Sequence, residues 1–222
     1  APYSEDPKSG FYAQAVEVMA QNTPSLSYQT EWLGEFWSDD LLGLTFSPPS
    51  RWIAIADQVY VNENATLEQA IVANAKVGIA LHDAGIACWN SKYFYNLERP
   101  QTYITRLIDP SWTPNLDNPL TGDEGITPSF PAYPSGHATF SASSAEALAS
   151  VFGYSYGMTD NCHKNRPEFS GYSRTFSSFY EMAQENAWSR VPLGVHFRMD
   201  AEEGVRFGTE IGRAVNKLPW KK

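Results

Sequence analysis

The 222-residue sequence has little cysteine and no long hydrophobic run. Cys88 and Cys162 permit one disulfide but do not imply one. They therefore leave the compartment of the protein open, and we take a periplasmic or secreted location as the working expectation. No stretch of about 18 apolar residues occurs, so we expect no membrane span. No basic segment followed by an apolar one stands at the start, and no signal peptide is predicted.

Basic residues are also few. The sequence contains 16 lysines and arginines against 25 aspartates and glutamates, which gives a formal net charge of −9. Nucleic acid and anionic membranes repel an acidic chain, so we expect neither as a partner. A local cluster of cations is therefore informative, because the overall charge of the protein does not favour it.

No alternating pattern of apolar and polar residues is long enough to predict a sheet, and no internal repeat or low-complexity segment occurs. What the sequence does contain is 42% hydrophobic and 14% aromatic residues, seven of them tryptophan, which suffices for a substantial core. These features predict an all-α helical bundle, with residues 1–222 in a single domain.

Helical periodicity and capping residues set the expected helix boundaries. The longest helix follows Thr66-x-x-Gln69, a capping box, and has apolar or small residues on every face, as is typical of a helix in the middle of a core. A proline-rich loop is expected over 109–134 and a polar loop over 154–174. The predicted helices cover residues 10–22, 27–37, 49–61, 67–99, 136–152, 175–191 and 200–217.

Two cations stand near the end of the long helix. Lys92 and Arg99 are seven residues apart, so about two turns of helix bring them onto nearly the same face, and Pro100 is expected to end the helix. A solvated basic stripe is the simpler interpretation. The flanking sequence CWNSKYFYNLERP is rich in large aromatics, however, so we expect both cations to be buried and to need a counter-anion.

A second segment, FPAYPSGHATF over 130–140, places Ser135, Gly136 and His137 at the start of a predicted helix. A helix N-terminus has unpaired backbone N–H groups and a positive dipole end, which favour a bound oxyanion. Ser135 is a good N-cap residue and Gly136 lets the backbone approach a ligand closely. The alternative is an ordinary capped helix start with an exposed His137.

The third segment, SRVPLGVHFRMD over 189–200, offers a further cation and an imidazole. A proline and a glycine interrupt the helix between Arg190 and His196, so both side chains can converge on one point. Asp200 follows His196 by four residues and can fix the tautomer of its imidazole. The remaining histidines, His82 and His163, lack such neighbours and are expected to be structural.

In their order and spacing, Lys-x6-Arg-Pro, Pro-Ser-Gly-His and Ser-Arg-x5-His-x3-Asp resemble the signature of the type-2 acid phosphatase and vanadium haloperoxidase superfamily. The resemblance implies an all-α fold with a site for phosphate or vanadate. Lys92, Arg99 and Arg190 would neutralise the oxyanion oxygens, and sulfate could also occupy the site. The Ser135 hydroxyl and the Gly136 amide would donate hydrogen bonds to it.

Within this resemblance, the two histidines have different expected roles. His196 would be the axial ligand of vanadium and His137 the acid–base group, which takes a proton from hydrogen peroxide. Lys92 would polarise the bound peroxide. Asp200 is the expected support of His196. Asp40 in FWSDDLLG is expected to pair with the arginine of the third segment, since aligning the Phe-Trp pair favours it over its neighbour, although both carboxylates could simply begin a loop.

Flanking residues favour a haloperoxidase over a phosphatase. FPAYPSGHATF and SRVPLGVHFRMD are similar to the fungal-type vanadium chloroperoxidase motifs, and Trp89 and Phe130 match aromatics beside the vanadate in that branch. The resemblance implies a single catalytic domain that oxidises halide with hydrogen peroxide to hypohalous acid. We expect iodide or bromide rather than chloride, because chloride needs the most oxidising site. The alternatives are hydrolysis of phosphomonoesters and a non-catalytic oxyanion-binding module.

The length departs from this family, whose members are usually longer and have an additional helical region before this one. We therefore expect the chain to be the C-terminal part of a haloperoxidase, an excised fragment or a compact variant. A missing N-terminal segment or a homo-oligomer would then cover part of its surface.

Overall fold

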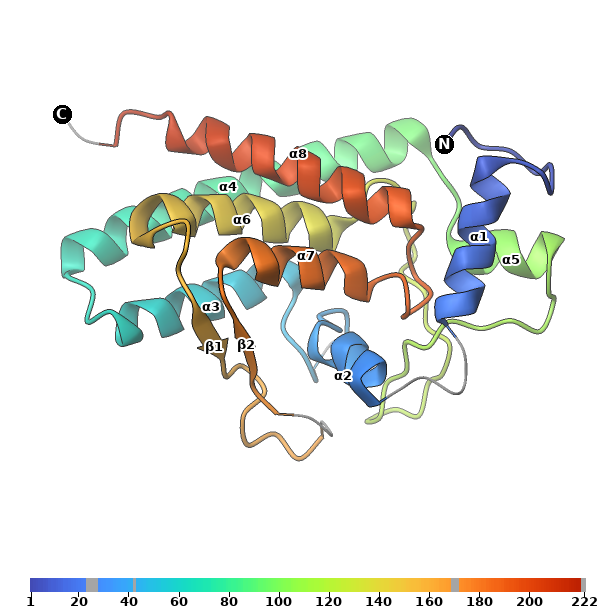
Figure 1. Ribbon diagram of the computed structural model, residues 1–222, viewed down its shortest axis with the longest axis horizontal. Coiled ribbons are helices and arrows are strands. Elements are labelled where there is room, and N and C mark those ends of the chain that lie inside the picture. The colour runs from blue at the N-terminus through green and yellow to red at the C-terminus, as the bar shows by residue number, and fades with distance from the viewer. Residues whose placement is uncertain (23–27, 42, 169–171, 221–222) are drawn as a thin grey trace.

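The computed structural model describes residues 1–22, 28–41, 43–168 and 172–220 (Figure 1). Most of this chain is helical, which confirms the predicted all-α class. The helices are α1 (Gly10–Gln21), α2 (Tyr28–Phe36), α3 (Pro48–Asn62), α4 (Leu67–Tyr95), α5 (Pro100–Leu107), α6 (Gly136–Phe152), α7 (Phe179–Ser189) and α8 (Arg198–Asn216), and the strands are β1 (Met158–Asp160) and β2 (Arg174–Phe176).

Helix α6 lies at the centre of the bundle, and every residue from Gly136 to Ala149 is buried. It packs against α8, α4, α7 and α3, which surround it in Figure 1. The backbones of α6 and α8 approach closely because α8 carries glycines on the facing side. A Cβ added at Gly208 would lie 2.2 Å from the Thr139 carbonyl oxygen. This packing on several sides fixes the direction in which the N-terminus of α6 points.

Helix α4 has one buried and one exposed face. Ala73 and Val77 are buried, whereas Ile71 and Ile86 on the other side are 58% and 60% exposed. The sequence predicts this helix in the middle of the core, which is wrong: α6 takes that place and α4 lies beside it. By length and composition alone the stretch 67–107 includes a helix that could cross a membrane. Its buried face packs against α6 and α8.

The chain turns sharply between α4 and α5. Asn96 adopts the left-handed conformation with φ 47° and ends α4, because this residue type tolerates that region better than most. Pro100 is the first residue of α5, where its missing N–H costs nothing, and Arg99 is the residue before it. The prediction that Lys92 and Arg99 lie on one helix is therefore wrong, and so is the prediction that Pro100 ends a helix.

A small hairpin interrupts the loop expected over 154–174. Strands β1 and β2 pair antiparallel, with Met158 opposite Phe176. Each strand has three residues, too few for an alternating pattern to reveal. The pairing also delays the start of α7 from the predicted residue 175 to Phe179. The predicted first residue of α2, residue 27, lies outside the described part of the chain, and both cysteines are free thiols.

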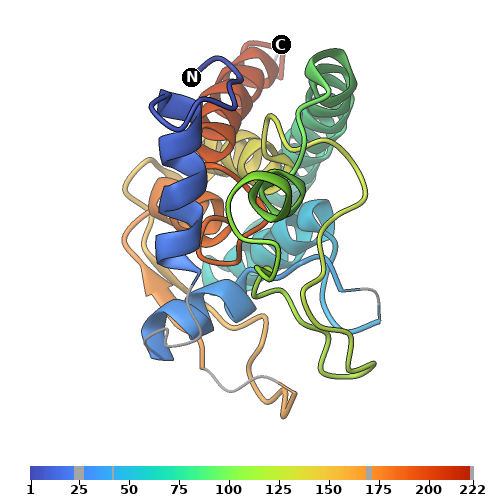
Figure 2. The same ribbon diagram turned by 90° about the vertical axis from the view of Figure 1, so that its right-hand side faces the viewer.

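At one end of the bundle, α1 and α5 pack beside the start of α8 (Figure 2). The rings of Phe11 and Phe197 have their centroids 4.9 Å apart, and Tyr103 packs edge-on against Phe197 at 6.2 Å. Phe197 directly follows His196, so this aromatic cluster anchors the backbone that carries the imidazole. The organisation of residues 1–222 as a single domain stays a prediction.

Candidate active site

The three segments singled out by sequence meet at the N-terminus of α6. A small buried cavity opens there between the start of α6, the turn after α7 and the loop before α6. Most of its lining was expected from sequence, but the two prolines were not, since nothing in their local pattern distinguishes them. The lining residues are Asp40, Pro48, Trp89, Arg99, Pro128, Phe130, Gly136, His137, Arg190 and His196.

Arg190 caps the C-terminal end of α7 and is fully buried. Its Nη1 donates to the Trp37 carbonyl oxygen at 3.1 Å, and its Nη2 donates to the carboxylate of Asp40. Its Nε has no hydrogen-bond partner among the described residues. Burial alone would raise the pKa of Asp40, but the adjacent guanidinium outweighs it and holds that pKa below its usual value. The structure thus pairs Arg190 with Asp40 and not with Asp39.

Arg99 is held by backbone carbonyls. Its Nε donates to the Phe130 oxygen at 2.8 Å and its Nη1 to the Val195 oxygen at 2.7 Å. Burial lowers its pKa to about 10, which still leaves the guanidinium charged near neutral pH. Its Nη2 is buried without a partner in the described chain. Arg99 and Arg190 therefore each retain one unused donor beside the same cavity.

Lys92 and Ser135 lie next to this cavity but are not among its lining residues. The Lys92 ammonium is fully buried and donates to the carbonyl oxygens of Pro131 and Ala132 at 2.8 and 2.9 Å. Burial lowers its pKa. Ser135 is the N-cap of α6, and its hydroxyl accepts from the Ala138 amide at 3.4 Å. Lys92 thus fixes the backbone at Pro131 and Ala132, and Ser135 fixes the first turn of α6.

The tautomer of His196 follows from its two contacts. Its Nε2 lies 3.1 Å from Arg99 Nη1, and a guanidinium can only donate, so Nε2 carries the lone pair. Its Nδ1 then carries the proton and donates to Asp200 Oδ2 at 3.0 Å. Burial lowers the pKa of His196 well below its ordinary value, which keeps the ring neutral. The same burial raises the pKa of Asp200.

His137 stands in the first turn of α6 and is almost entirely buried. Its Nε2 has no hydrogen-bond partner within the described ranges and lies 3.8 Å from Asp40 Oδ2. Burial and the neighbouring Arg190 lower its pKa to about 3. The ring is therefore neutral, and its free nitrogen faces the side of the cavity where the arginine–carboxylate pair lies.

Two aromatic rings form the apolar wall. The centroids of Trp89 and Phe130 are 5.2 Å apart, and Phe130 also lies under the guanidinium of Arg99 at 4.9 Å. A Cβ added at Gly136 would come within 3.1 Å of the Trp89 ring. Glycine is thus the residue that lets the helix N-terminus approach this wall.

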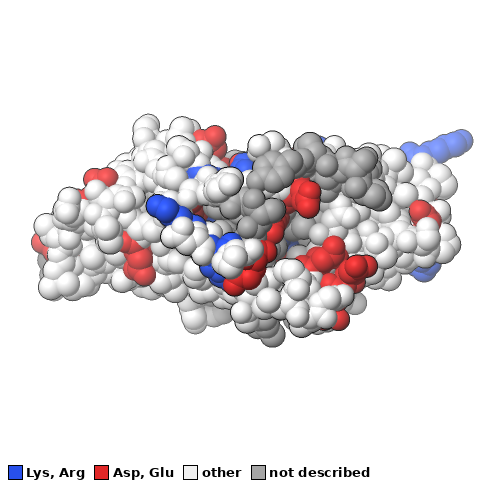
Figure 3. Space-filling model, turned by 90° about the horizontal axis from the view of Figure 1, so that it is seen from below, with Lys and Arg blue, Asp and Glu red and all other residues white. Residues whose placement is uncertain are grey.

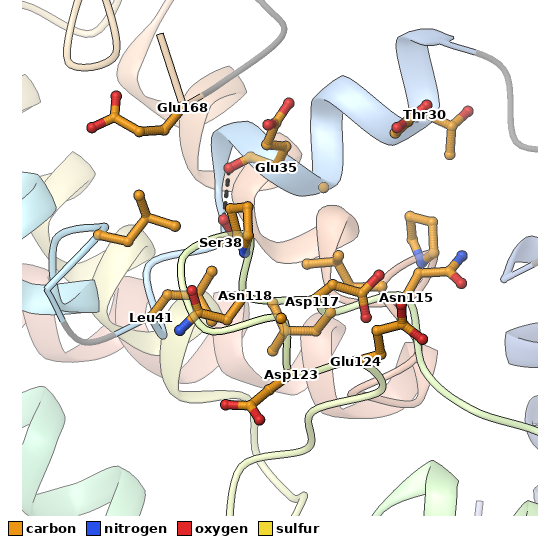
Figure 4. A pocket seen from close by; sticks show the side chains of 18 residues that line it. Thr30, Glu35, Ser38, Leu41, Asn115, Asp117, Asn118, Asp123, Glu124 and Glu168 are labelled. Carbon is orange, nitrogen blue, oxygen red and sulfur yellow. Dashed lines mark hydrogen bonds between the residues drawn. The ribbon is translucent and has the colours of Figure 1, made fainter. Parts of the chain in front are cut away.

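A second cavity, of about 320 Å³, lies between α2 and the loop over 115–124 (Figure 4). Figure 3 shows acidic side chains near the middle of the face on which it opens. None of its lining residues is a lysine, arginine or histidine, so it does not suit an oxyanion. Its carboxylates are Glu31, Glu35, Asp117, Asp123, Glu124 and Glu168.

The fold and the first cavity together define a class of protein: an all-α bundle with a buried, cationic cavity at a helix N-terminus. Two guanidinium groups and one imidazole each present an unused nitrogen there, and burial of like charges is stable only with a counter-anion. A tetrahedral oxyanion such as vanadate or phosphate fits this donor set. The particular role of each residue stays a prediction.

Comparison with known proteins identifies the family. Residues 73–219 match the VCPO second helical-bundle domain, VCPO being vanadium chloroperoxidase. The vanadium chloroperoxidase of Curvularia inaequalis is 29% identical over 220 residues, which covers 76% of this chain and 36% of that protein. The chain belongs to the vanadium haloperoxidase family, as the three motifs predict.

Solved structures agree with this assignment. A bacterial vanadium-dependent iodoperoxidase superposes with a TM-score of 0.85 at 32% identity, covering 96% of this chain and 50% of that one. A holo-type bacterial vanadium-dependent chloroperoxidase superposes with a TM-score of 0.66 at 17% identity, over 93% of this chain and 47% of that one, and shows the fold alone. The chain spans half or less of the length of these relatives.

Proposed function

We propose that this chain provides the vanadate site of a haloperoxidase, which oxidises halide with hydrogen peroxide to hypohalous acid. The observation that carries the proposal is a pair of unused guanidinium nitrogens beside one cavity, Nη2 of Arg99 and Nε of Arg190. The lone pair on Nε2 of His196 borders the same cavity. The guanidinium groups would hold an oxyanion by charge-assisted hydrogen bonds, and His196 Nε2 would offer it an imidazole nitrogen.

Two arginines would hold the oxyanion. Arg99 and Arg190 come from different segments and are fixed by carbonyl and carboxylate partners, so they need little reorganisation on binding. The amide of Gly136 adds a donor from the helix N-terminus. Lys92 uses two of its three N–H bonds on backbone carbonyls, which leaves one for the oxyanion or for peroxide.

Vanadate, when bound, supplies a Lewis acid that activates hydrogen peroxide for the two-electron oxidation of halide. His137 would accept the peroxide proton at Nε2, since its ring is neutral and that atom has no hydrogen-bond partner in the described chain. Asp40 Oδ2, 3.8 Å away, would stabilise the imidazolium that forms. A bound oxyanion also offsets the arginine charge that depresses the pKa of His137, which makes it a stronger base in the loaded protein.

Iodide or bromide is the proposed halide, with chloride disfavoured because it needs the most oxidising site. The likeness to a bacterial iodoperoxidase at 32% identity supports this choice. Trp89 and Phe130 narrow the cavity with apolar surface, which suits a small, weakly hydrated anion better than a phosphoester with its leaving group.

The test compares two activities in the complete protein. We expect orthovanadate-loaded protein to oxidise iodide with peroxide, and vanadate-free protein to show at most weak hydrolysis of a small aryl phosphate. Iodide oxidation is followed by triiodide absorbance and hydrolysis by phenolate release. Turnover of the phosphate ester without any vanadate-dependent halide oxidation would replace the proposal with the phosphatase alternative. Neither activity, with oxyanion binding intact, would favour the binding module.

A further inference from the structure

A third buried guanidinium, besides those of Arg99 and Arg190, lies near the proposed vanadate site. Arg51 of α3 is 0% exposed, and its Nη2 donates to Asp160 Oδ2 at 2.9 Å. Its Nη1 lies 2.6 Å from His163 Nε2, an atom that also lies 3.0 Å from the Phe36 carbonyl oxygen. The same Nη1 lies 3.6 Å from Asp39 Oδ1. The sequence analysis did not single out Arg51, since a lone arginine in a helix has no distinguishing pattern.

The segment from Phe36 to Asp40 connects this cluster to the site. On one side the guanidinium of Arg51 lies over the rings of Phe36 and Trp37, 4.5 and 4.9 Å from their centroids. On the other side the carbonyl of Trp37 and the carboxylate of Asp40 both accept from Arg190. The segment is therefore held between two buried arginines, one of which lines the oxyanion cavity.

Asp39 makes the connection electrostatic as well as steric. Its carboxylate is buried and neither oxygen has a hydrogen-bond partner among the described residues, so the nearby Arg51 is its main source of compensation. Burial raises the pKa of Asp39 to about 7, and Arg51 opposes this rise. Without Arg51, a carboxylate one residue before Asp40 would lose its counter-charge, and the rings that rest on the guanidinium would lose their support.

We propose that Arg51 is a positioning residue: by holding Phe36, Trp37 and Asp39, it sets the place of the two acceptors that orient Arg190 toward the bound oxyanion. The inference rests on the proposed oxyanion site, but not on which reaction the site catalyses. Supporting partners of ligand-holding groups are typically worth about 10- to 100-fold in affinity. We expect a loss of that size when Arg51 is replaced.

The experiment measures binding, not turnover. Arg51→Met in the complete protein is titrated with orthovanadate and, separately, with inorganic phosphate by calorimetry. The matched control is Lys76→Met, which removes another buried cation, bonded to Ser150 and Asn216 on a different part of the bundle. We expect about a 10- to 100-fold loss of affinity in Arg51→Met and a change of less than about twofold in Lys76→Met. Parental affinity in a folded Arg51→Met protein would overturn the inference.

A double-mutant cycle covers the case in which Arg51→Met does not fold, and it separates positioning from general stability. Arg51→Lys keeps the charge but loses the fork that contacts Asp160 and Asp39 together. Combined with Asp40→Asn, its effect on orthovanadate affinity should be smaller than in the parent, because the segment then no longer orients Arg190. Effects that simply multiply would refute the positioning role. Absence of oxyanion binding in the parent itself would refute the proposed function, and this inference with it.

Discussion

The support of His196 by Asp200 offers the sharpest test of the site, because one carboxylate oxygen serves two purposes. Asp200 Oδ2 accepts from His196 Nδ1 and from the Phe197 amide, each at 3.0 Å, and the whole residue is buried. Asp200→Ala leaves both donors buried without a partner. At about 1–3 kcal/mol for each unsatisfied donor, the free energy of unfolding should fall by about 2–6 kcal/mol.

The same substitution should alter oxyanion binding through the tautomer. Without an acceptor at Nδ1, only the Arg99 donor still favours the lone pair on Nε2. A larger share of His196 should then carry its proton on Nε2, where the lone pair beside the cavity is lost. We expect orthovanadate affinity to drop about 10- to 100-fold, the size usual for such supporting partners, which corresponds to about 1.4–2.8 kcal/mol. Denaturant unfolding measures the first effect, calorimetry the second, and nitrogen NMR of the imidazole the tautomer itself.

Asp200→Asn is the matched control. Its amide oxygen can replace Oδ2 as acceptor, but its NH₂ group must then occupy the position of Oδ1, which has no partner among the described residues. The Asn variant should therefore bind orthovanadate more tightly than Asp200→Ala while remaining less stable than the parent. Unchanged affinity in Asp200→Ala, with Nδ1 still protonated, would refute the assignment of Nε2 as the ligand atom.

Three further predictions follow from the same structure. His196→Ala should abolish tight orthovanadate binding, whereas His137→Ala should keep binding and lose iodide oxidation; equal affinity of His196→Ala and the parent would contradict this. Burial and Arg190 lower the pKa of His137 from 6.5 to about 3. Between these two pH values, His137 is protonated in the unfolded chain but not in the folded chain. Stability should thus fall as the pH drops from about 6.5 toward 3, and His137→Gln should lessen that fall in urea titrations; an unchanged slope would speak against it. Gly208→Ala should destabilise the bundle by about 1–3 kcal/mol or more, since the new Cβ would lie 2.2 Å from the Thr139 oxygen, and a parental melting temperature would show that α6 and α8 can separate without cost.

The charge of the site contrasts with that of the protein. The chain carries a formal net charge of −9, yet Lys92, Arg99 and Arg190 gather around one buried cavity. The second cavity, lined by Ser38 and Leu41 among others, has six carboxylates and no cation in its described lining. The proposed oxyanion would therefore be attracted by these fixed and desolvated groups nearby, and not by the overall charge of the molecule.

Local relations were readable from the sequence alone. Ser135 is an N-cap residue before a helical pattern, and it caps α6 as that pattern predicts. His196 and Asp200 are four residues apart, and this spacing is short enough for the pair to meet whatever surrounds it. The helices, the all-α class and the resemblance to haloperoxidases could also be predicted from the sequence, because periodicity and motif order depend on neighbours along the chain.

Tertiary structure decided the rest, because it concerns groups that are distant in sequence. Arg99 reaches the cavity by a turn at Asn96 and not by the phase of a helix, which a pattern of apolar residues could not foretell. Asp39 and Asp40 are neighbours in sequence but pair with different buried arginines. Asp39 lies near Arg51 of α3, and Asp40 pairs with Arg190 at the end of α7. Such pairings are set by the packing of helices around α6, and they cannot be predicted from the spacing of residues in the sequence.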